Sequence, residues 1–295
     1  MAISAKLVKE LREKTGAGMM DCKKALEACN GDVEASFDWL REKGIAKAAK
    51  KADRIAAEGL TAFVVDGNKG AMVEVNSETD FVAKNAEFQE LVQLVAQTVV
   101  KANPADLDAA LKLDVEGKDL QTVIAEKSGK IGEKLSFRRF VVLEKADDEV
   151  FGAYSHMGGK MTALVKLSNA DEAKAKDIAM HVAASAPQYI DRTAIPAEVL
   201  DRELAVLKAQ ALEENSKAAK PKPENIIEKM VQGRLNKNLK EMCLVDQEFI
   251  KDPDQTVAKY LGNGKVLEIA RFQVGEGMAK REENFAEEVA AQMKG

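Results

Sequence analysis

Two segments of this chain carry the pattern of a β-hairpin, and each is followed by a helical pattern. The turn sequence DGNKG interrupts an apolar run at 60–75, and HMGGK interrupts another at 150–167. Turn-forming residues between two apolar runs are a strong signal for antiparallel strands. Apolar residues then recur at helical spacing over 86–102 and 171–185. The repeated order predicts that a helix follows and covers each hairpin.

The rest of the central region extends this pattern. A helical stretch lies near 119–127, and strand-like runs lie at 137–143 and 266–274. Hairpins combined with amphipathic helices are typical of an α+β fold. We therefore expect two similar α+β core subdomains with antiparallel strands, related by a structural duplication.

Residues 4–44 predict three short helices. Ser4 and Asp32 are suitable N-caps, and Gly44 is a suitable end for the third helix. The pattern resembles the ubiquitin-associated type of three-helix bundle, whose small core is expected to be only modestly stable. The Ala- and Lys-rich stretch 45–58 is interpreted as a solvated helical connector. An RNA-contacting patch is less favoured, because no aromatic residues interleave with the lysines.

The region from Pro196 to about Leu239 predicts two helices joined by a polar turn. The turn contains Pro221 and Pro223, which neither helix can include. We expect an antiparallel helical hairpin that projects from the body of the protein. A last helical pattern covers 278–293.

These patterns divide the chain, whose 295 residues suffice for two or three domains, into five parts. The parts are the bundle with its connector (1–54), core subdomain N (55–147), core subdomain C (148–190 and 240–275), the helical hairpin or coiled coil inserted in subdomain C (191–239), and a C-terminal helical module (276–295).

The composition argues against several classes of protein. The net charge is -5 with a pI near 5.4, whereas a general nucleic-acid binder usually carries a basic surface. No apolar run reaches transmembrane length, and the first residues lack a hydrophobic signal core. The 3 cysteines and 2 histidines show no metal-ligand spacing. We expect a cytoplasmic protein that binds no membrane, nucleic acid or metal.

The sequence offers no motif for chemistry performed by the chain itself. Its glycines match neither a phosphate-binding loop nor the dinucleotide fingerprint, and no Gly-x-Ser-x-Gly sequence occurs. His156 could act as a base in a small-molecule enzyme, but nothing nearby reads as a nucleophile and its neighbours indicate a tight turn. A surface contact is the preferred interpretation of His156, and we expect no cofactor and no enzymatic activity.

The segment 79–85, TDFVAKN, lies where a strand-like run passes into the next helix. Connections of this kind lie on the surface and often carry function, so the adjacent Asp80 and Phe81 suggest a probe that enters another molecule. Spacing alone favours core packing instead. Phe81 precedes Phe88 by seven residues, so a helix started early and capped by Thr79 or Asp80 would place both rings on one stripe.

Five motifs resemble signatures of the elongation factor Ts family. They are TDFVAKN at 79–85, LREKTGAGMMDCKKAL at 11–26, KIGE at 130–133 followed by Arg138 and Arg139, AMHVAA at 179–184, and FQVGEG at 272–277. They follow the family order over nearly the whole chain, and together they are highly specific. The hairpin tip around 215–225 departs from the family pattern, which leaves the hairpin's length and any role in self-association open.

The resemblance implies a bacterial guanine-nucleotide exchange factor that binds elongation factor Tu and binds no nucleotide itself. Asp80 and Phe81 would intrude beside the partner's nucleotide site, and the segment from Thr79 to Val82 would displace the partner's Mg²⁺. Residues 278–293 would hold the partner's nucleotide domain. The other partner contacts that the family implies are Arg12, Met19, Met20, Lys23, Ile131 and His156.

One alternative stays open. The bundle could make the chain an adaptor of the ubiquitin-associated type that binds a different protein. Removing residues 1–54 separates the two hypotheses, because an adaptor would lose its main partner and an exchange factor would keep its core contacts.

Overall fold

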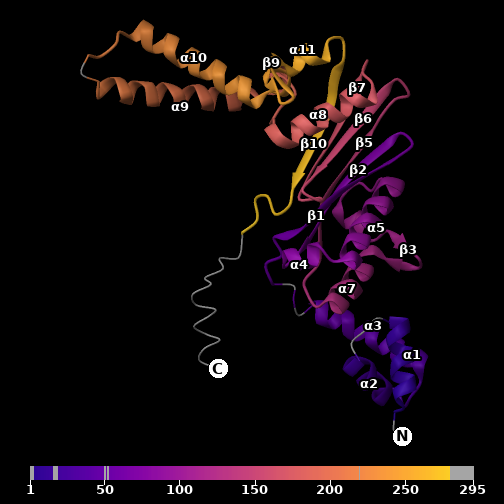
Figure 1. Cartoon of the computed structure of the whole chain (residues 1–295). Coiled ribbons are helices and arrows are strands. Elements are labelled where there is room, and N and C mark those ends of the chain that lie inside the picture. The colour runs from indigo at the N-terminus through magenta and orange to yellow at the C-terminus, as the bar shows by residue number, and fades with distance from the viewer. Residues whose placement is uncertain (1–2, 16–18, 50, 52, 219, 280–295) are drawn as a thin grey trace. The chain divides into compact units, whose positions relative to one another are not determined.

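The computed structural model describes residues 3–15, 19–49, 51, 53–218 and 220–279. These fall into two compact units (Figure 1). The first comprises residues 1–142, 156–162 and 272–295, and the second comprises 143–155 and 163–271. Helices and antiparallel strands occur in both, so the predicted α+β fold class is confirmed.

The sheet of the first unit has the strand order β1-β2-β5. The strands are β1 (Glu58–Asp66), β2 (Lys69–Ser77) and β5 (Ser136–Glu144). β1 and β2 form the predicted antiparallel hairpin, in which Asp66 pairs with Lys69. Between β2 and β5 lie α4 (Asp80–Ala83), α5 (Ala86–Ala102), α6 (Leu107–Leu111), the short strands β3 (Asp114–Val115) and β4 (Lys118–Asp119), and α7 (Leu120–Ile131).

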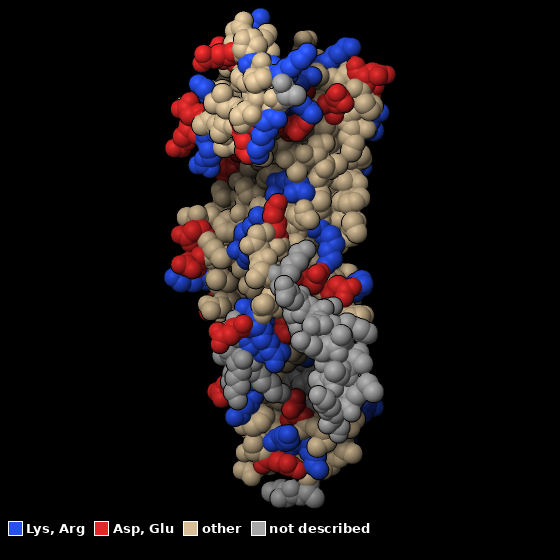
Figure 2. Space-filling view, turned by 90° about the vertical axis from the view of Figure 1, so that its left-hand side faces the viewer, with Lys and Arg blue, Asp and Glu red and all other residues tan. Residues whose placement is uncertain are grey.

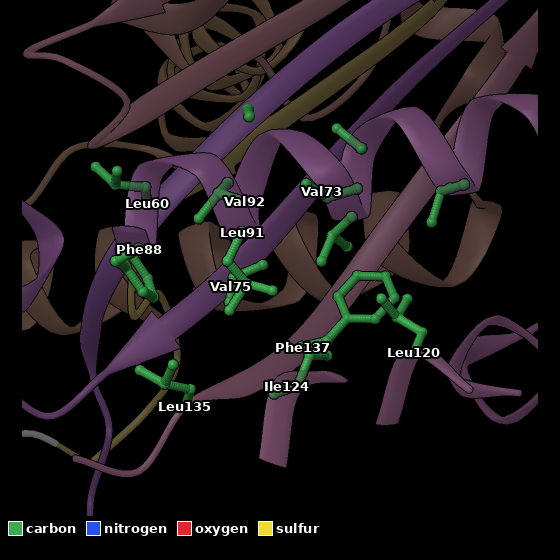
Figure 3. Close-up of a cluster of buried hydrophobic side chains, with 14 of the residues drawn as sticks. Leu60, Val73, Val75, Phe88, Leu91, Val92, Leu120, Ile124, Leu135 and Phe137 are labelled. Atoms are coloured by element: carbon green, nitrogen blue, oxygen red, sulfur yellow. The ribbon is translucent and has the colours of Figure 1, made fainter. Parts of the chain in front are cut away.

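Helix α5 packs on this sheet through a single apolar stripe. Phe88, Leu91 and Val92 point toward Val73 and Val75 of β2 (Figure 3). Each of these side chains is almost completely buried, and burial of a side chain of this size stabilises a fold by roughly 1.5–3 kcal/mol. Leu120 and Ile124 of α7 join the same core. The predicted helix at 86–102 is therefore confirmed, and its packing fixes the position of the segment before it.

A second three-stranded sheet has the order β10-β7-β6. Its strands are β6 (Glu149–His156), β7 (Met161–Ser168) and β10 (Lys265–Gln273). In both sheets a hairpin is followed by helices, and a later strand then pairs beside the hairpin's second strand. α8 (Glu172–Ser185) packs closely on β6, since a Cβ added at Gly152 would lie 2.0 Å from the carbonyl oxygen of Ala175. β8 (Glu248–Phe249), β9 (Asp252–Thr256) and α11 (Val257–Leu261) complete this region.

The N-terminal bundle consists of α1 (Ala5–Thr15), α2 (Met19–Ala28) and α3 (Val33–Ala49). The predicted caps form: the Ser4 hydroxyl accepts the N–H of Leu7, and the Asp32 carboxylate accepts the N–H of Ala35. The predicted end of α3 at Gly44 is wrong. The helix continues because the Ala- and Lys-rich residues after Gly44 favour helix. A Cβ added at Gly129 of α7 would lie 2.7 Å from the Gly44 backbone, so this close approach requires glycine at 129.

Helices α9 (Ala197–Ser216) and α10 (Glu224–Met242) form the predicted helical hairpin in the second unit and lie side by side (Figure 1). Leu207, Ala211, Ile227 and Val231 are buried between them. The Asn215 side chain closes the turn by bonding both the N–H and the C=O of Lys222. α10 runs three residues beyond the predicted end at 239.

The chain leaves β10 at Gln273 and turns at residues 274–277. The helix expected at 278–293 falls almost wholly outside the described residues. Within the described ranges, no helix has both the length and the apolar character needed to cross a membrane, and no group of three or more His, Cys, Asp or Glu side chains is arranged to hold a metal ion.

Candidate functional site

The segment from Thr79 to Ala83, which we term the ledge, forms a short step between β2 and α5. Thr79 has extended backbone angles and its hydroxyl accepts the N–H of Val82, so Thr79 is the N-cap of the four-residue helix α4. Asn85 then caps α5 by accepting the N–H of Glu87 at 2.8 Å. Two caps six residues apart therefore divide the expected helix in two.

This division determines where Phe81 lies. Phe81 is 79% exposed, whereas Phe88 is fully buried. The core-packing interpretation of Phe81 is therefore wrong, because α4 ends before α5 begins and the two rings do not share a stripe. The next two residues, Val82 and Ala83, are buried in the core of the first unit. An exposed aromatic ring thus stands on a helix whose other side is anchored.

Asp80 is paired within the ledge. Its carboxylate accepts a hydrogen bond from the ammonium of Lys84 at 2.6 Å, and this bond holds the pKa of Asp80 below its usual value, with the charge of Lys160 adding to the effect. The Lys84 ammonium also lies 5.8 Å from the centre of the Phe81 ring, a distance at which a cation is attracted to the ring face. The ledge therefore presents an ionised acid beside an exposed aromatic ring.

The Glu133 carboxylate binds the residues at the start of the ledge. One carboxylate oxygen accepts the backbone N–H groups of Glu78 and Thr79, both at 3.0 Å, and the other accepts the Thr79 hydroxyl at 2.6 Å. Glu78 in turn pairs with Arg54 and accepts the N–H of Lys134. Glu133 belongs to the KIGE motif, and the motif alone did not predict a role for its carboxylate. A carboxylate directly after a helix-ending glycine was the available signal.

His156 ends β6 and is exposed at the start of the predicted tight turn. Within the first unit this turn packs on β1: the Gly159 carbonyl oxygen accepts both the N–H and the hydroxyl of Thr61, at 2.7 and 2.8 Å. Lys160 of the same turn pairs with Glu58 and is close enough to affect the charge of Asp80. Met157 of this turn is 74% exposed, as Phe81 of the ledge is 79% exposed.

The remaining predicted contacts lie elsewhere in the first unit. Arg12 is exposed on α1, and Met19 and Met20 are 59% and 63% exposed at the start of α2. Lys23 is also exposed and pairs with Glu27. Ile131, in contrast, is partly buried against the core at the end of α7. The structure brings together the ledge and the turn at 156–160, and the bundle residues form a separate group.

A buried carboxylate ties the chain after β10 to the first sheet. Glu74 of β2 accepts bonds from Arg138 and Arg139 of β5, at 2.9 and 2.6 Å, and from the N–H of Gly275 at 2.9 Å. Burial acts to raise the pKa of Glu74, but the bonds from Gly275, Arg138 and Arg139 outweigh it, so this pKa lies below its usual value. The Arg138–Arg139 and FQVGEG motifs therefore meet at one residue.

On the face drawn in Figure 2, acidic and basic side chains are interspersed over the described residues, with no broad area of a single charge. This mixture fits the net charge of -5. A surface of this kind differs from the basic stripe that a general nucleic-acid binder presents.

A family model described as elongation factor TS matches residues 78–276, a range that contains the ledge, Glu133 and the strands β5, β6, β7 and β10. The chain belongs to the elongation factor Ts family. Elongation factor Ts from Pediococcus pentosaceus is 58% identical over 294 residues, which are 99% of each chain. The similarity to this relative includes the N-terminal bundle, and the adaptor alternative is not favoured.

Proposed function

We propose that this member of the elongation factor Ts family promotes guanine-nucleotide exchange in translation elongation, by binding elongation factor Tu and accelerating the release of its GDP. Asp80 and Phe81 enter the partner beside its nucleotide site and disturb the contacts to Mg²⁺ and phosphate. The chain makes and breaks no covalent bond itself. Family membership supports the partner and the process, and the geometry of the ledge supports the mechanism.

The single observation that carries the mechanism is the exposure of Phe81. A large aromatic ring that is 79% exposed leaves apolar surface in water, so covering that surface with a partner would be favourable. The ring is also held in place, because Val82 and Ala83 are buried and Thr79 caps the helix. A rigid, exposed ring loses little conformational freedom on entering a pocket.

The energetics require more than one contact. A thousandfold acceleration of release corresponds to about 4 kcal/mol, and burial of one Phe contributes roughly 1.5–3 kcal/mol. The remainder comes from disturbing the Mg²⁺ and phosphate contacts, which binding elsewhere must offset. The partner contacts proposed for this role are Arg12, Met19, Met20, Lys23, Ile131 and His156.

The variant Phe81→Ala tests the mechanism. Release of fluorescent GDP from elongation factor Tu, followed by stopped flow at saturating factor, should slow roughly tenfold to a hundredfold, as the loss of one buried Phe implies. The matched control is Ile250→Ala, which shortens an apolar side chain that is 44% exposed in the second unit and should leave release unchanged. Release by Phe81→Ala at the wild-type rate would show that the ring is not the intruding group.

A further inference from the structure

We propose that Glu133 is a positioning residue for exchange: it orients the ledge so that Phe81 can enter the partner. This inference rests on the proposed function and assigns a role to a residue that does not itself contact the nucleotide site. The observation behind it is that one carboxylate, that of Glu133 just after α7, accepts hydrogen bonds from three donors at the start of the ledge.

The bonds reach the two residues that set the direction of α4. The N–H groups of Glu78 and Thr79 lie ahead of the helix and have no partner inside it. Glu133 accepts both of them and also accepts the Thr79 hydroxyl proton, which leaves the hydroxyl oxygen free to accept the N–H of Val82. The Thr79 carbonyl accepts the hydroxyl of Ser77 at 2.9 Å. Thr79 is thus held on both sides, with Glu133 on one of them.

Glu133 is itself held firmly. Gly132 ends α7 with φ at 92°, a left-handed conformation that a side chain would strain, and the chain reverses there toward the ledge. The Glu133 carbonyl accepts the hydroxyl of Ser128 at 2.6 Å. Helix α7 packs against α3 and α5. Because α7 is packed in place, the Glu133 carboxylate holds the backbone at the start of α4 in a fixed position relative to α7.

Helix α4 depends on this support because it is very short. Four residues provide one turn, and a single turn is unfavourable by itself since many backbone angles are fixed for few hydrogen bonds. Val82 and Ala83 anchor one side in the core, but they do not determine how the first turn begins. Without Glu133, Thr79 and Glu78 can adopt other backbone angles, and Phe81 samples other directions.

The test compares Glu133→Ala with Glu133→Gln in the full-length protein. Alanine removes all three bonds, so the maximal rate of fluorescent GDP release should fall roughly tenfold or more, since misplacement of about 1 Å can cost a hundredfold. Glutamine can rescue: its oxygen can accept both N–H groups while its NH₂ donates to Thr79. We expect Glu133→Gln to stay within about threefold of the wild type, because the bonds are kept; the remaining loss reflects that bonds to a charged group are roughly twice as strong as neutral ones.

The control is Asp119→Ala. Asp119 caps the opposite end of α7 by accepting the N–H of Thr122 at 2.6 Å, and it does not contact the ledge. Its loss destabilises the same helix, so thermal unfolding should shift for both Asp119→Ala and Glu133→Ala, while the plateau rate of GDP release should fall only for the latter. A parallel loss of rate in both variants would mean that Glu133 acts only through general stability and would overturn the proposal.

The double variant Glu133→Ala/Phe81→Ala tests whether Glu133 acts through the ring. If it does, the double variant should release GDP no more slowly than Phe81→Ala alone, because residues acting as a unit are not additive. Multiplicative losses would overturn the proposal. If the wild-type chain does not accelerate GDP release, the proposed function is overturned as well. If the wild type accelerates release, Phe81→Ala slows it and Glu133→Ala releases GDP at the wild-type rate, only the role of Glu133 is overturned.

Discussion

Phe81 and Phe88 are seven residues apart and equally apolar, yet one is almost fully exposed and the other fully buried. The difference is made by Asn85, whose side chain starts α5 afresh and breaks the stripe that would have joined the two rings. Periodicity describes which residues share a face only while a helix is continuous. The cap at Asn85 separates the two helical segments, and the packing of Val82 and Ala83 then leaves Phe81 on the exposed side.

At the same scale, His181 illustrates a buried group whose protonation the fold decides. Its Nδ1 accepts the N–H of Ile250 at 3.1 Å, so Nε2 carries the proton and donates to Gln247 at 2.8 Å. Burial lowers the pKa of His181 below 6.5, since a charge on the ring would be desolvated and would lose the bond to Ile250. The side chain is fully buried.

We expect the free energy of unfolding to fall as the pH decreases through the range between 6.5 and the lowered pKa of His181. In that range the unfolded chain binds a proton that the folded chain does not, and this favours unfolding. Urea unfolding at several pH values measures the effect. His181→Gln should flatten the dependence, because it removes the buried group whose pKa is lowered. An unchanged pH dependence in His181→Gln would contradict the assignment.

At the scale of elements, Glu74 links three segments that are distant in sequence. It lies on β2, its two arginine partners lie on β5, and Gly275 follows β10. Arg139 also lies over the Phe272 ring at 4.3 Å. These contacts fix the path of the chain as it leaves β10.

Glu74→Ala should lower the free energy of unfolding by about 3–5 kcal/mol, because it leaves two partly buried guanidinium groups without their shared acceptor. Urea unfolding monitored by circular dichroism gives the value. The comparison variant is Glu87→Ala, whose carboxylate pairs with Lys130 and Lys127 at the surface and should contribute only about 0–1 kcal/mol. Equal losses of unfolding free energy in the two variants would show that the buried Glu74 cluster stabilises the fold no more than a surface ion pair does.

At the scale of the whole molecule, one group of proposed partner contacts lies in the bundle, and the others are the ledge, Ile131 at the end of α7 and His156 at the end of β6. An exchange factor must bind the nucleotide-free partner best, since it shifts the equilibrium only through differential affinity. By linkage, GDP must then weaken the factor's binding to the same degree. Contacts that do not change during release contribute affinity, and contacts made only as GDP leaves contribute rate.

The two groups should therefore separate kinetically. Met19→Ala/Met20→Ala should raise the factor concentration needed for half-maximal GDP release about tenfold or more, since two exposed apolar side chains are lost from the interface, and should leave the maximal rate unchanged. Phe81→Ala should lower the maximal rate instead. Val65→Ala, which shortens a 45%-exposed side chain on β1, is the control. A lower maximal rate in the methionine variant would contradict this division.

The sequence by itself determined the class of fold, the hairpins, the long helices and the family. These follow from local signals: apolar period, caps and turn residues act over a few positions, and so they are readable without the rest of the chain. Gly44 was the local signal that misled, because the helix-favouring residues after it continue α3 past the glycine.

Tertiary structure alone decided which side of the ledge faces solvent and what holds it. Phe81 is exposed because Val82 and Ala83 are buried by β1, β2 and α5, and Thr79 is oriented by a carboxylate 54 positions away. The Glu74 cluster similarly joins residues up to 201 positions apart. Contacts over such separations depend on how the elements pack, and no periodicity in the sequence encodes them.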